Sequence, residues 1–315
     1  MAITKELRKL GIGGTDVAAI MGYDEKRDKY SVWAEKKGLL QRQPPNPRML
    51  LGKYFERGII DYYAALTGRA VEFCDVTSVH PNRPWMVYTP DALCRNEKRG
   101  VDAKFVSYDQ RFKWGETADA VPQRIQLQCW WYMAALDFDA WDVAAVLSDS
   151  EPMIFTFYRD LSVEEPMLEE AEEFYQRYLI GTEVPEPGHS DDTARALRQQ
   201  FPRHVSKLRQ AEEAERTNIS ALFTAHDMQD KVTNERARIE NVLKLAIGDG
   251  EGLTWPSGRV TWRTTKDSLK TDWERLAVAL MKGYSDAERE ALLATFTEVR
   301  AGSRRFLLQG EPTEL

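Results

Sequence analysis

The chain has 315 residues, of which 43% are hydrophobic and 30% charged, and its formal net charge is −7. This length is enough for a sizeable core and two domains, whereas the acidic balance argues against a protein that coats nucleic acid nonspecifically. The sequence has no run of about eighteen apolar residues and no charged start before an apolar centre, so we expect neither a membrane-spanning helix nor a secretory signal. The cysteines lie far apart without a CxxC pair, so we expect no disulfide framework, no zinc site and a cytoplasmic protein.

A glycine-rich turn at residues 11–15 separates a basic start containing Arg8 from an apolar run at residues 17–21. The run predicts a short helix that ends at Gly22. Free backbone N–H groups at such a turn suit an anion, and Thr15 can either cap the helix or bond a phosphate. A plain helix cap beside solvated basic residues is the alternative.

Two further helices are predicted before the first strand. Residues 30–37 form one that closes at Gly38, and residues 48–67 form a long amphipathic one that stops at Gly68. The proline-rich residues 43–47 between them predict an exposed linker.

In the helix predicted at residues 48–67, Glu56 lies on the apolar stripe, because apolar residues stand three and four positions away from it. A buried carboxylate is costly unless it is paired or bound to metal. Glu56 is therefore a candidate metal ligand, and the alternative is an edge position reached by an arginine such as Arg57 or Arg69.

Residues 85–106 predict a hairpin that turns at residues 96–100. Side chains alternate along a strand, so Asp102 and Lys104 share one side. The other side carries Val101, Ala103 and Phe105. The hairpin brings Asp91 beside Asp102, and two adjacent carboxylates raise each other's pKa unless a cation such as Mg²⁺ lies between them. The alternative is an ordinary half-exposed hairpin with a surface salt bridge.

Two further stretches carry candidate site residues. Residues 107–120 interleave the basic Arg111 and Lys113 with aromatic rings including Trp114, a pattern that suits a nucleic-acid backbone and unstacked bases. A plain surface loop is the alternative. Residues 122–136 predict a helix with Gln128 on its apolar stripe, where the amide must find a hydrogen-bond partner.

Shorter patterns predict the remaining elements. Strands are expected at residues 71–79, 141–147, 153–158 and 303–309, a hairpin at 253–264, and helices at 163–179, within 194–247 and at 273–281.

A helix glutamate, a Pro-Asp, an Asp-x-Lys and a helix glutamine follow one another along the chain. This order resembles the PD-(D/E)-x-K nuclease superfamily and, within it, the phage-type alkaline exonucleases, the lambda exonuclease and YqaJ-like viral recombinase family. The matching stretches are GIGGTDVAAIMG, GKYFERG, TPDAL, VDAKF and VPQRIQLQCWWYM.

The resemblance implies an α/β fold with a central mixed sheet flanked by helices. It places an exonuclease domain at residues 1–188, followed by a helical extension at residues 189–247 and a small α+β region at residues 248–315. The role of the two later regions stays open between DNA contact, oligomerisation and partner docking.

The same resemblance implies a role for each matching residue. The residues implied as metal ligands are Glu56, Asp91, Asp102 and Ala103. The implied ion is Mg²⁺, for which Mn²⁺ can substitute. Lys104 matches the lysine that orients the attacking water, and Gln128 matches the motif glutamine. Asp102 stands where many members have glutamate, and Trp130 stands where relatives often carry a second glutamine.

Substrate contacts are implied as well. Arg8 and Thr15 keep the separation of the arginine and hydroxyl that bind the terminal 5′-phosphate in the family. The segment around Arg111, Lys113 and Trp114 matches a loop that faces the DNA.

The function implied is a metal-dependent 5′-to-3′ exonuclease that acts on double-stranded DNA ends. Its 3′ single-stranded tails would pass to a single-strand annealing protein in phage-type recombination, inside a bacterial host. Family members commonly form ring trimers, and no membrane partner is expected. The alternatives are a noncatalytic DNA-end-binding scaffold and an endonuclease of the same superfamily. An iron–sulfur nuclease is disfavoured because it needs four closely spaced cysteines.

Overall fold

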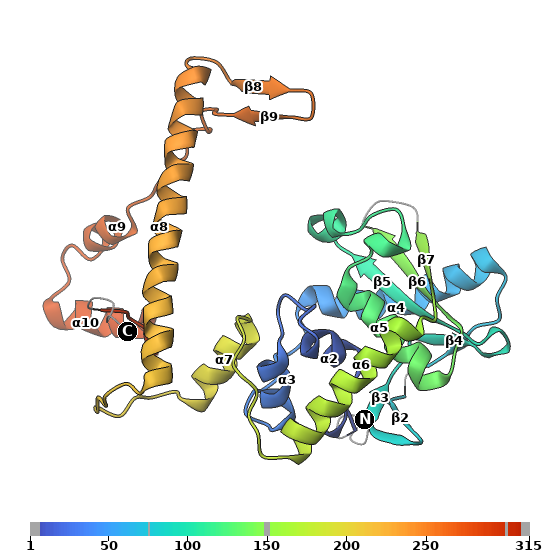
Figure 1. Ribbon diagram of the computed structural model, residues 1–315. Coiled ribbons are helices and arrows are strands. Elements are labelled where there is room, and N and C mark those ends of the chain that lie inside the picture. Colours follow the sequence, from blue (N-terminus) through green and yellow to red (C-terminus); the bar gives the residue numbers. More distant parts are fainter. Residues whose placement is uncertain (1–6, 75, 148–151, 300–301, 310–315) are drawn as a thin grey trace. The chain divides into compact units, whose positions relative to one another are not determined.

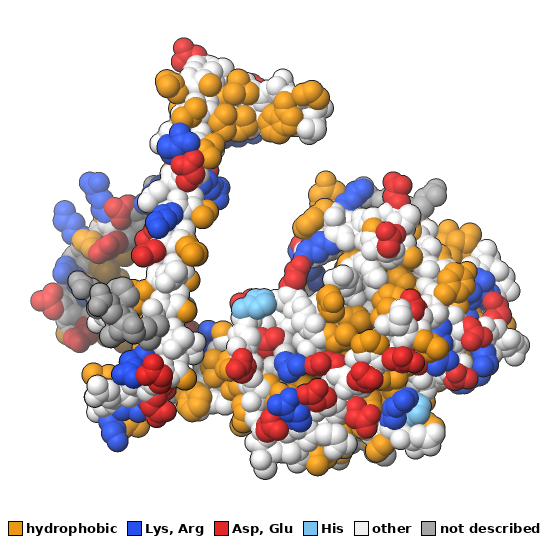
Figure 2. Space-filling view, in the orientation of Figure 1, with side chains coloured by type: hydrophobic (Ala, Val, Ile, Leu, Met, Phe, Trp, Pro, Cys, Tyr) orange, Lys and Arg blue, Asp and Glu red, His pale blue; other side chains and the backbone are white. Residues whose placement is uncertain are grey.

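The computed structural model describes residues 7–74, 76–147, 152–299 and 302–309, and the chain divides into two units, Met1–Pro202 and Arg203–Leu315. No helix within these described ranges is long and apolar enough to cross a membrane. Acidic and basic side chains are interspersed over the visible face of the first unit (Figure 2).

A five-stranded mixed sheet forms the centre of the first unit (Figure 1). In spatial order its strands are β1 (Glu72–Phe73), β4 (Ala92–Cys94), β5 (Arg99–Val106), β6 (Ala140–Leu147) and β7 (Met153–Tyr158). Only β5 and β6 run parallel, and the helix between them supplies the crossover that parallel strands require. The predicted α/β class with a central mixed sheet flanked by helices is confirmed.

The prediction of one strand at residues 71–79 is wrong, because this stretch pairs in two places. Its first part is β1, which pairs with β4, and its last part is β2 (Ser78–His80), which pairs with β3 (Arg83–Tyr88) in a separate two-stranded sheet.

Helices cover both faces of the central sheet. The larger core is built by α2 (Gly14–Ile20), α3 (Lys29–Lys36), α5 (Gln123–Leu136) and α6 (Leu161–Phe174), which a π-helical turn, Tyr175–Ile180, continues. The smaller core lies under α4 (Pro47–Thr67), whose Ile59, Ile60 and Tyr63 pack on the sheet.

The bounds of α4 follow from local signals. The Asn46 side chain accepts a hydrogen bond from the N–H of Met49, and Pro47 begins the helix, where its missing N–H costs nothing. Gly68 ends it with a φ of 70°, a left-handed conformation that glycine adopts without strain. The predicted helix at residues 48–67 is confirmed.

The last helix of the first unit, α7 (Asp191–Gln200), packs on α3. The N-cap of α7 is joined to that of α3, because the N–H of Ser190 donates to Asp28 Oδ2 at 3.1 Å. The helix ends before Pro202, which disfavours a helical conformation at Phe201. The extension that we predict from residue 189 is therefore interrupted, and its first helix belongs with the first unit.

The second unit begins with the 35-residue helix α8 (Glu213–Ile247). Two predictions are confirmed by the hairpin of β8 (Gly252–Trp255) and β9 (Gly258–Thr261) and by the helix α9 (Trp273–Leu280). Apolar side chains lie exposed along the hairpin (Figure 2). Helix α10 (Asp286–Phe296) was not predicted. The predicted strand at residues 303–309 is wrong: these residues form no strand and pair with none of the described strands.

Gly100 in β5 provides a test of how tightly the sheet packs. A Cβ atom there would lie 2.2 Å from Cζ3 of Trp141, a ring that is fully buried. Overpacking of a core costs about 1–3 kcal/mol, so Gly100→Ala is expected to lower the free energy of unfolding in urea by about this amount.

Gly58→Ala in α4 is the matched control. A Cβ atom at Gly58 meets nothing within 4 Å, and alanine is favoured over glycine inside a helix by roughly 1 kcal/mol. This variant should keep or gain stability, and equal losses in the two variants would contradict the packing described for β5 and β6.

Candidate active site

The antiparallel pairing of β4 with β5 brings two carboxylates together. Ala92 pairs with Val101, so Asp91, which immediately precedes β4, lies beside Asp102. Asp91 Oδ2 accepts a hydrogen bond from the N–H of Ala103 at 2.9 Å. The predicted hairpin is confirmed.

Asp102 and Lys104 form an ion pair on one side of β5, in which Asp102 is buried and Lys104, 23% exposed, is half-buried. Lys104 Nζ donates to Asp102 Oδ2 at 2.8 Å, and the Asp102 side chain is only 1% exposed. The other oxygen, Asp102 Oδ1, is buried without a hydrogen-bond partner among the described residues. Val101, Ala103 and Phe105 belong to the core on the α4 side, which is the alternation that the sequence predicts.

The electrostatics couple these groups. Burial, then the neighbouring Asp102 and, more weakly, Glu56 raise the pKa of Asp91 to about 7, although Lys104 opposes them. Burial disfavours the ammonium of Lys104, but Asp102 and Asp91 outweigh that effect and raise its pKa. The site thus holds more negative charge than Lys104 alone neutralises.

Glu56 lies on α4 and is paired with a lysine of its own helix. Its two oxygens accept from Lys53 Nζ at 2.8 and 3.0 Å, and the side chain is 25% exposed. Arg57 and Arg69, which we considered as partners, form ion pairs elsewhere. Glu56 is near enough to raise the pKa of Asp91, but its contact partner is Lys53.

The donor set determines which cation these residues can hold. Within the described ranges, no three His, Cys, Asp or Glu side chains are placed as a ready metal-binding group. Asp91 and Asp102 nevertheless fit a hard divalent cation, since both are oxygen donors and Asp102 Oδ1 lacks a partner. Of the other predicted ligands, Glu56 is engaged by Lys53, and Ala103 contacts Asp91 through its N–H.

Gln128 finds its partner on its own helix. Its Nε2 donates to the Tyr132 hydroxyl at 3.0 Å, and that hydroxyl donates to the carbonyl of Thr89 at 3.2 Å. Burial first, and then the charge of Asp102, raise the pKa of Tyr132 well above its ordinary value. The amide therefore supports the segment that leads into Asp91, whereas Trp130 donates to the carbonyl of Tyr158.

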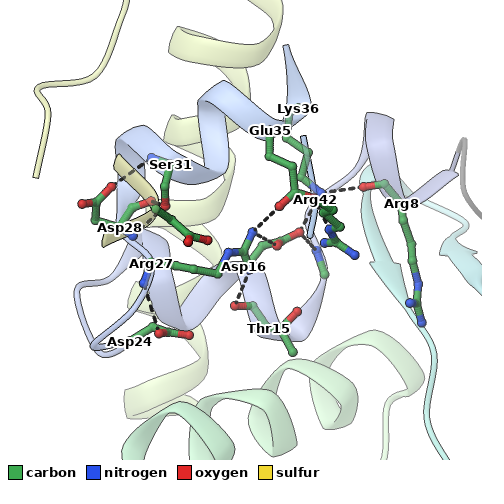
Figure 3. A network of polar contacts seen from close by, with 12 residues as sticks. Arg8, Thr15, Asp16, Asp24, Arg27, Asp28, Ser31, Glu35, Lys36 and Arg42 are labelled. Carbon is green, nitrogen blue, oxygen red and sulfur yellow. Dashed lines mark hydrogen bonds and ion pairs between the residues drawn. The ribbon is translucent and has the colours of Figure 1, made fainter. Parts of the chain in front are cut away.

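The two residues expected at a terminal phosphate lie at the N-terminal segment (Figure 3). Arg8 is exposed, and its Nε donates to Thr77 Oγ1 at 3.2 Å. Thr15 is exposed in the first turn of α2 but does not cap it: Gly13 is the N-cap, and its N–H donates to Asp16 Oδ2 at 3.1 Å. The expectation of a Thr15 cap is wrong because Thr15 is the second residue inside the helix, past the N-cap Gly13.

Sequence reasoning missed the buried charges around Asp16. Lys36 Nζ lies 2.7 Å from Asp16 Oδ2, and Arg27 Nη2 lies 2.9 Å from Asp16 Oδ1. Burial raises the pKa of Asp16, but Lys36 and Arg27 outweigh it and hold that pKa well below its ordinary value. The available signal was an aspartate inside the otherwise apolar run of α2.

The expected DNA-facing segment has mixed exposure. Trp114 is half-buried and packs on Phe155 with 5.7 Å between ring centroids, so its ring is a core contact. Lys113 Nζ lies 2.5 Å from Glu25 Oε2. Arg111 is exposed and lies over the ring of Tyr108, 5.6 Å from its centroid.

Residues 5–139 match the family model of the YqaJ-like viral recombinase domain. The YqaJ protein of Bacillus subtilis (strain 168) is 18% identical over 293 residues, which cover 92% of this chain and 91% of that protein. Among solved structures, an alkaline exonuclease from Laribacter hongkongensis, LHK-Exo, shares 16% identity at a TM-score of 0.45 over 56% of this chain and 93% of its own. A phage-related exonuclease from Haemophilus somnus 129PT shares 13% identity at a TM-score of 0.45 over 54% of this chain and 95% of its own.

The raised pKa of Asp91 predicts a pH dependence of stability. Between 3.8 and about 7 the folded state keeps a proton that the unfolded state has lost, so the free energy of unfolding falls as pH rises through this window. Asp91→Asn lacks this titration. We therefore expect the free energy of unfolding of this variant, relative to that of wild type, to rise by on the order of 1–3 kcal/mol between about pH 4 and about pH 8. Urea unfolding in the presence of EDTA measures this difference.

Asp109→Asn is the control, because the pKa of Asp109 is lowered in the folded state whereas that of Asp91 is raised. The Arg48 side chain hydrogen-bonds this exposed carboxylate and lowers its pKa, so its contribution to stability is lost as pH falls below about 4. A difference between Asp91→Asn and wild type that stays constant with pH would contradict the coupling described for Asp91.

Proposed function

Because residues 5–139 match the family model of the YqaJ-like viral recombinase domain, we propose that this protein is a divalent-metal-dependent exonuclease that degrades duplex DNA in the 5′-to-3′ direction. One observation carries the proposal: Asp102 is buried with one oxygen on Lys104 and the other without a described partner, beside an Asp91 whose pKa is raised to about 7. A carboxylate pair with one member buried, and with less positive charge beside it than it needs, is a costly way to stabilise a fold. Groups with such perturbed pKa values cluster at functional sites.

Asp91 and Asp102 are the residues that would hold the cation, together with the Ala103 carbonyl and with Glu56 once it releases Lys53. Mg²⁺ suits these oxygen donors, and Mn²⁺ can substitute. When bound, such an ion lowers the pKa of a coordinated water so that hydroxide is available at neutral pH.

Lys104 has two functions in this proposal. Its ammonium holds one oxygen of Asp102 at 2.8 Å, which keeps that carboxylate oriented. The same positive charge lies where the phosphodiester becomes more negative during attack, and a charge placed in advance stabilises that state. Gln128 acts at a distance from the chemistry, because it holds Tyr132 against the segment that precedes Asp91.

Arg8 and Thr15 support the proposed polarity. Both side chains are exposed on the N-terminal segment, and a guanidinium with a hydroxyl is suited to a terminal 5′-phosphate. Digestion of one strand from its 5′ end leaves a 3′ single-stranded tail. We propose that a single-strand annealing protein receives this tail in phage-type recombination inside a bacterial host, and that the exonuclease assembles as a ring trimer.

Lys104→Met tests the catalytic assignment. On linear duplex with 5′-phosphates and Mg²⁺, we expect the release of acid-soluble nucleotides to fall at least about 100-fold, the effect of removing a preorganised transition-state charge. Binding of the same duplex in a gel-shift assay should change little. Lys98→Met, in the turn of the same hairpin and paired with Asp137 at 3.3 Å, is the matched control and should keep full activity.

Full activity of Lys104→Met, or no Mg²⁺- or Mn²⁺-dependent degradation by wild type, would overturn the proposal and favour a DNA-end-binding scaffold. A covalently closed circle should remain intact, and its cleavage would point to an endonuclease instead. Label at the 5′ end should be released before label at the 3′ end of the same strand.

A further inference from the structure

Thr77 is a buried polar residue, 4% exposed, that sequence reasoning did not single out. Its hydroxyl accepts from Arg8 Nε at 3.2 Å and shares a second hydrogen bond with the hydroxyl of Thr89 at 2.8 Å. A threonine hydroxyl has one donor and two acceptor sites, so it can make both bonds at once. Thr77 therefore joins the Arg8 side chain to the segment that ends at Asp91.

The backbone of Arg8 has an anchor of its own. Lys36 Nζ donates to the Arg8 carbonyl at 2.5 Å, and the Lys36 side chain is 3% exposed. The Asp16 carboxylate, which pairs with Lys36 (Figure 3), also accepts from the N–H of Gly13. The buried charges thus fix two points of the segment that carries Arg8 and Thr15.

A buried ion pair is weak evidence for stability, since desolvation of the two charges offsets much of their attraction. The Asp16–Lys36 pair is better explained by its other hydrogen bonds, which hold the Arg8 carbonyl and the Gly13 N–H. Arg27, the second cation on Asp16, likewise reaches the carbonyl of Thr15 with Nη1 at 3.4 Å. Asp16, Lys36 and Arg27 therefore each bond the main chain between residues 8 and 15.

We propose that Thr77 and Lys36 are positioning residues for Arg8, Thr77 fixing its guanidinium and Lys36 its backbone, so that the terminal 5′-phosphate of DNA meets a preformed site. The inference rests on the proposed exonuclease function. The bond to Thr77 uses one of five guanidinium N–H donors, and no other hydrogen bond joins this guanidinium to a described residue. An arginine held in place loses less conformational freedom when it binds an anion, which strengthens recognition.

Thr77→Val is the test, because it removes the hydroxyl and keeps the branched shape. The measured quantity is kcat/KM on a duplex with a 5′-phosphate divided by kcat/KM on the same duplex with a 5′-hydroxyl. We expect this ratio to fall about tenfold, the scale of one lost hydrogen bond to a charged group. The value for the 5′-hydroxyl duplex should be unchanged, and Thr77→Ser should restore the ratio.

Thr156→Val is the matched control. Its hydroxyl also bonds a charged group, donating to Asp142 Oδ1 at 2.7 Å, but it lies on β7 in a different network. This variant should leave the ratio unchanged. Lys36→Met, checked for folding by thermal denaturation, should lower the ratio as Thr77→Val does.

An unchanged ratio in Thr77→Val, or an equal loss on both duplexes, overturns the inference. A wild type that degrades both duplexes at the same rate also overturns it and leaves the exonuclease proposal standing. A wild type that degrades neither contradicts the proposed function and the inference with it.

Discussion

The antiparallel register of β4 against β5 is the constraint on which the candidate site depends, because it sets Asp91 beside Asp102. A second buried aspartate of the same sheet shows the contrast. Asp142, also 1% exposed, is bonded through both oxygens, by Tyr63, Arg99 and Thr156. A buried carboxylate with every acceptor used is a structural element. Asp102 keeps one oxygen without a described partner and shares its surroundings with Asp91, which is the arrangement expected where a cation completes the site.

The segment from Thr89 to Asp91 connects the proposed phosphate-binding residues to the proposed metal ligands. At its start, the Thr89 hydroxyl reaches Thr77 and so the Arg8 side chain, and its carbonyl accepts from Tyr132 on α5. At its end, Asp91 bonds the backbone of β5. Residues proposed to recognise a DNA end and residues proposed to hydrolyse it are therefore joined by one short stretch of chain. The bonds from Tyr132 to the Thr89 carbonyl and from the Ala103 N–H to Asp91 hold this stretch independently of the Thr77 hydroxyl.

Local chemistry accounts for the features that the sequence predicted correctly. Asn46, Pro47 and Gly68 set the bounds of α4, and the period of two separates Asp102 and Lys104 from the apolar face of β5. The missed features depend on partners distant in sequence. The Asp16–Lys36 pair, the inward packing of Trp114 and the split of residues 71–79 between two sheets follow from tertiary contacts that no local pattern encodes. The roles of the site residues come from the family resemblance, and the geometry adds the proximity and the charge imbalance that give those roles a physical basis.

Calorimetric titration of Mn²⁺ into the protein without DNA tests the central claim most directly, because it detects the proposed cation site without relying on catalysis. Saturable binding is expected for wild type and for Asp109→Asn, whose carboxylate is exposed and paired with Arg48. Asp102→Asn should weaken binding at least about tenfold, since it removes a charged oxygen ligand of a hard cation. Equal affinity in Asp102→Asn and wild type, or no binding by wild type, would contradict the assignment of Asp91 and Asp102 as a metal site.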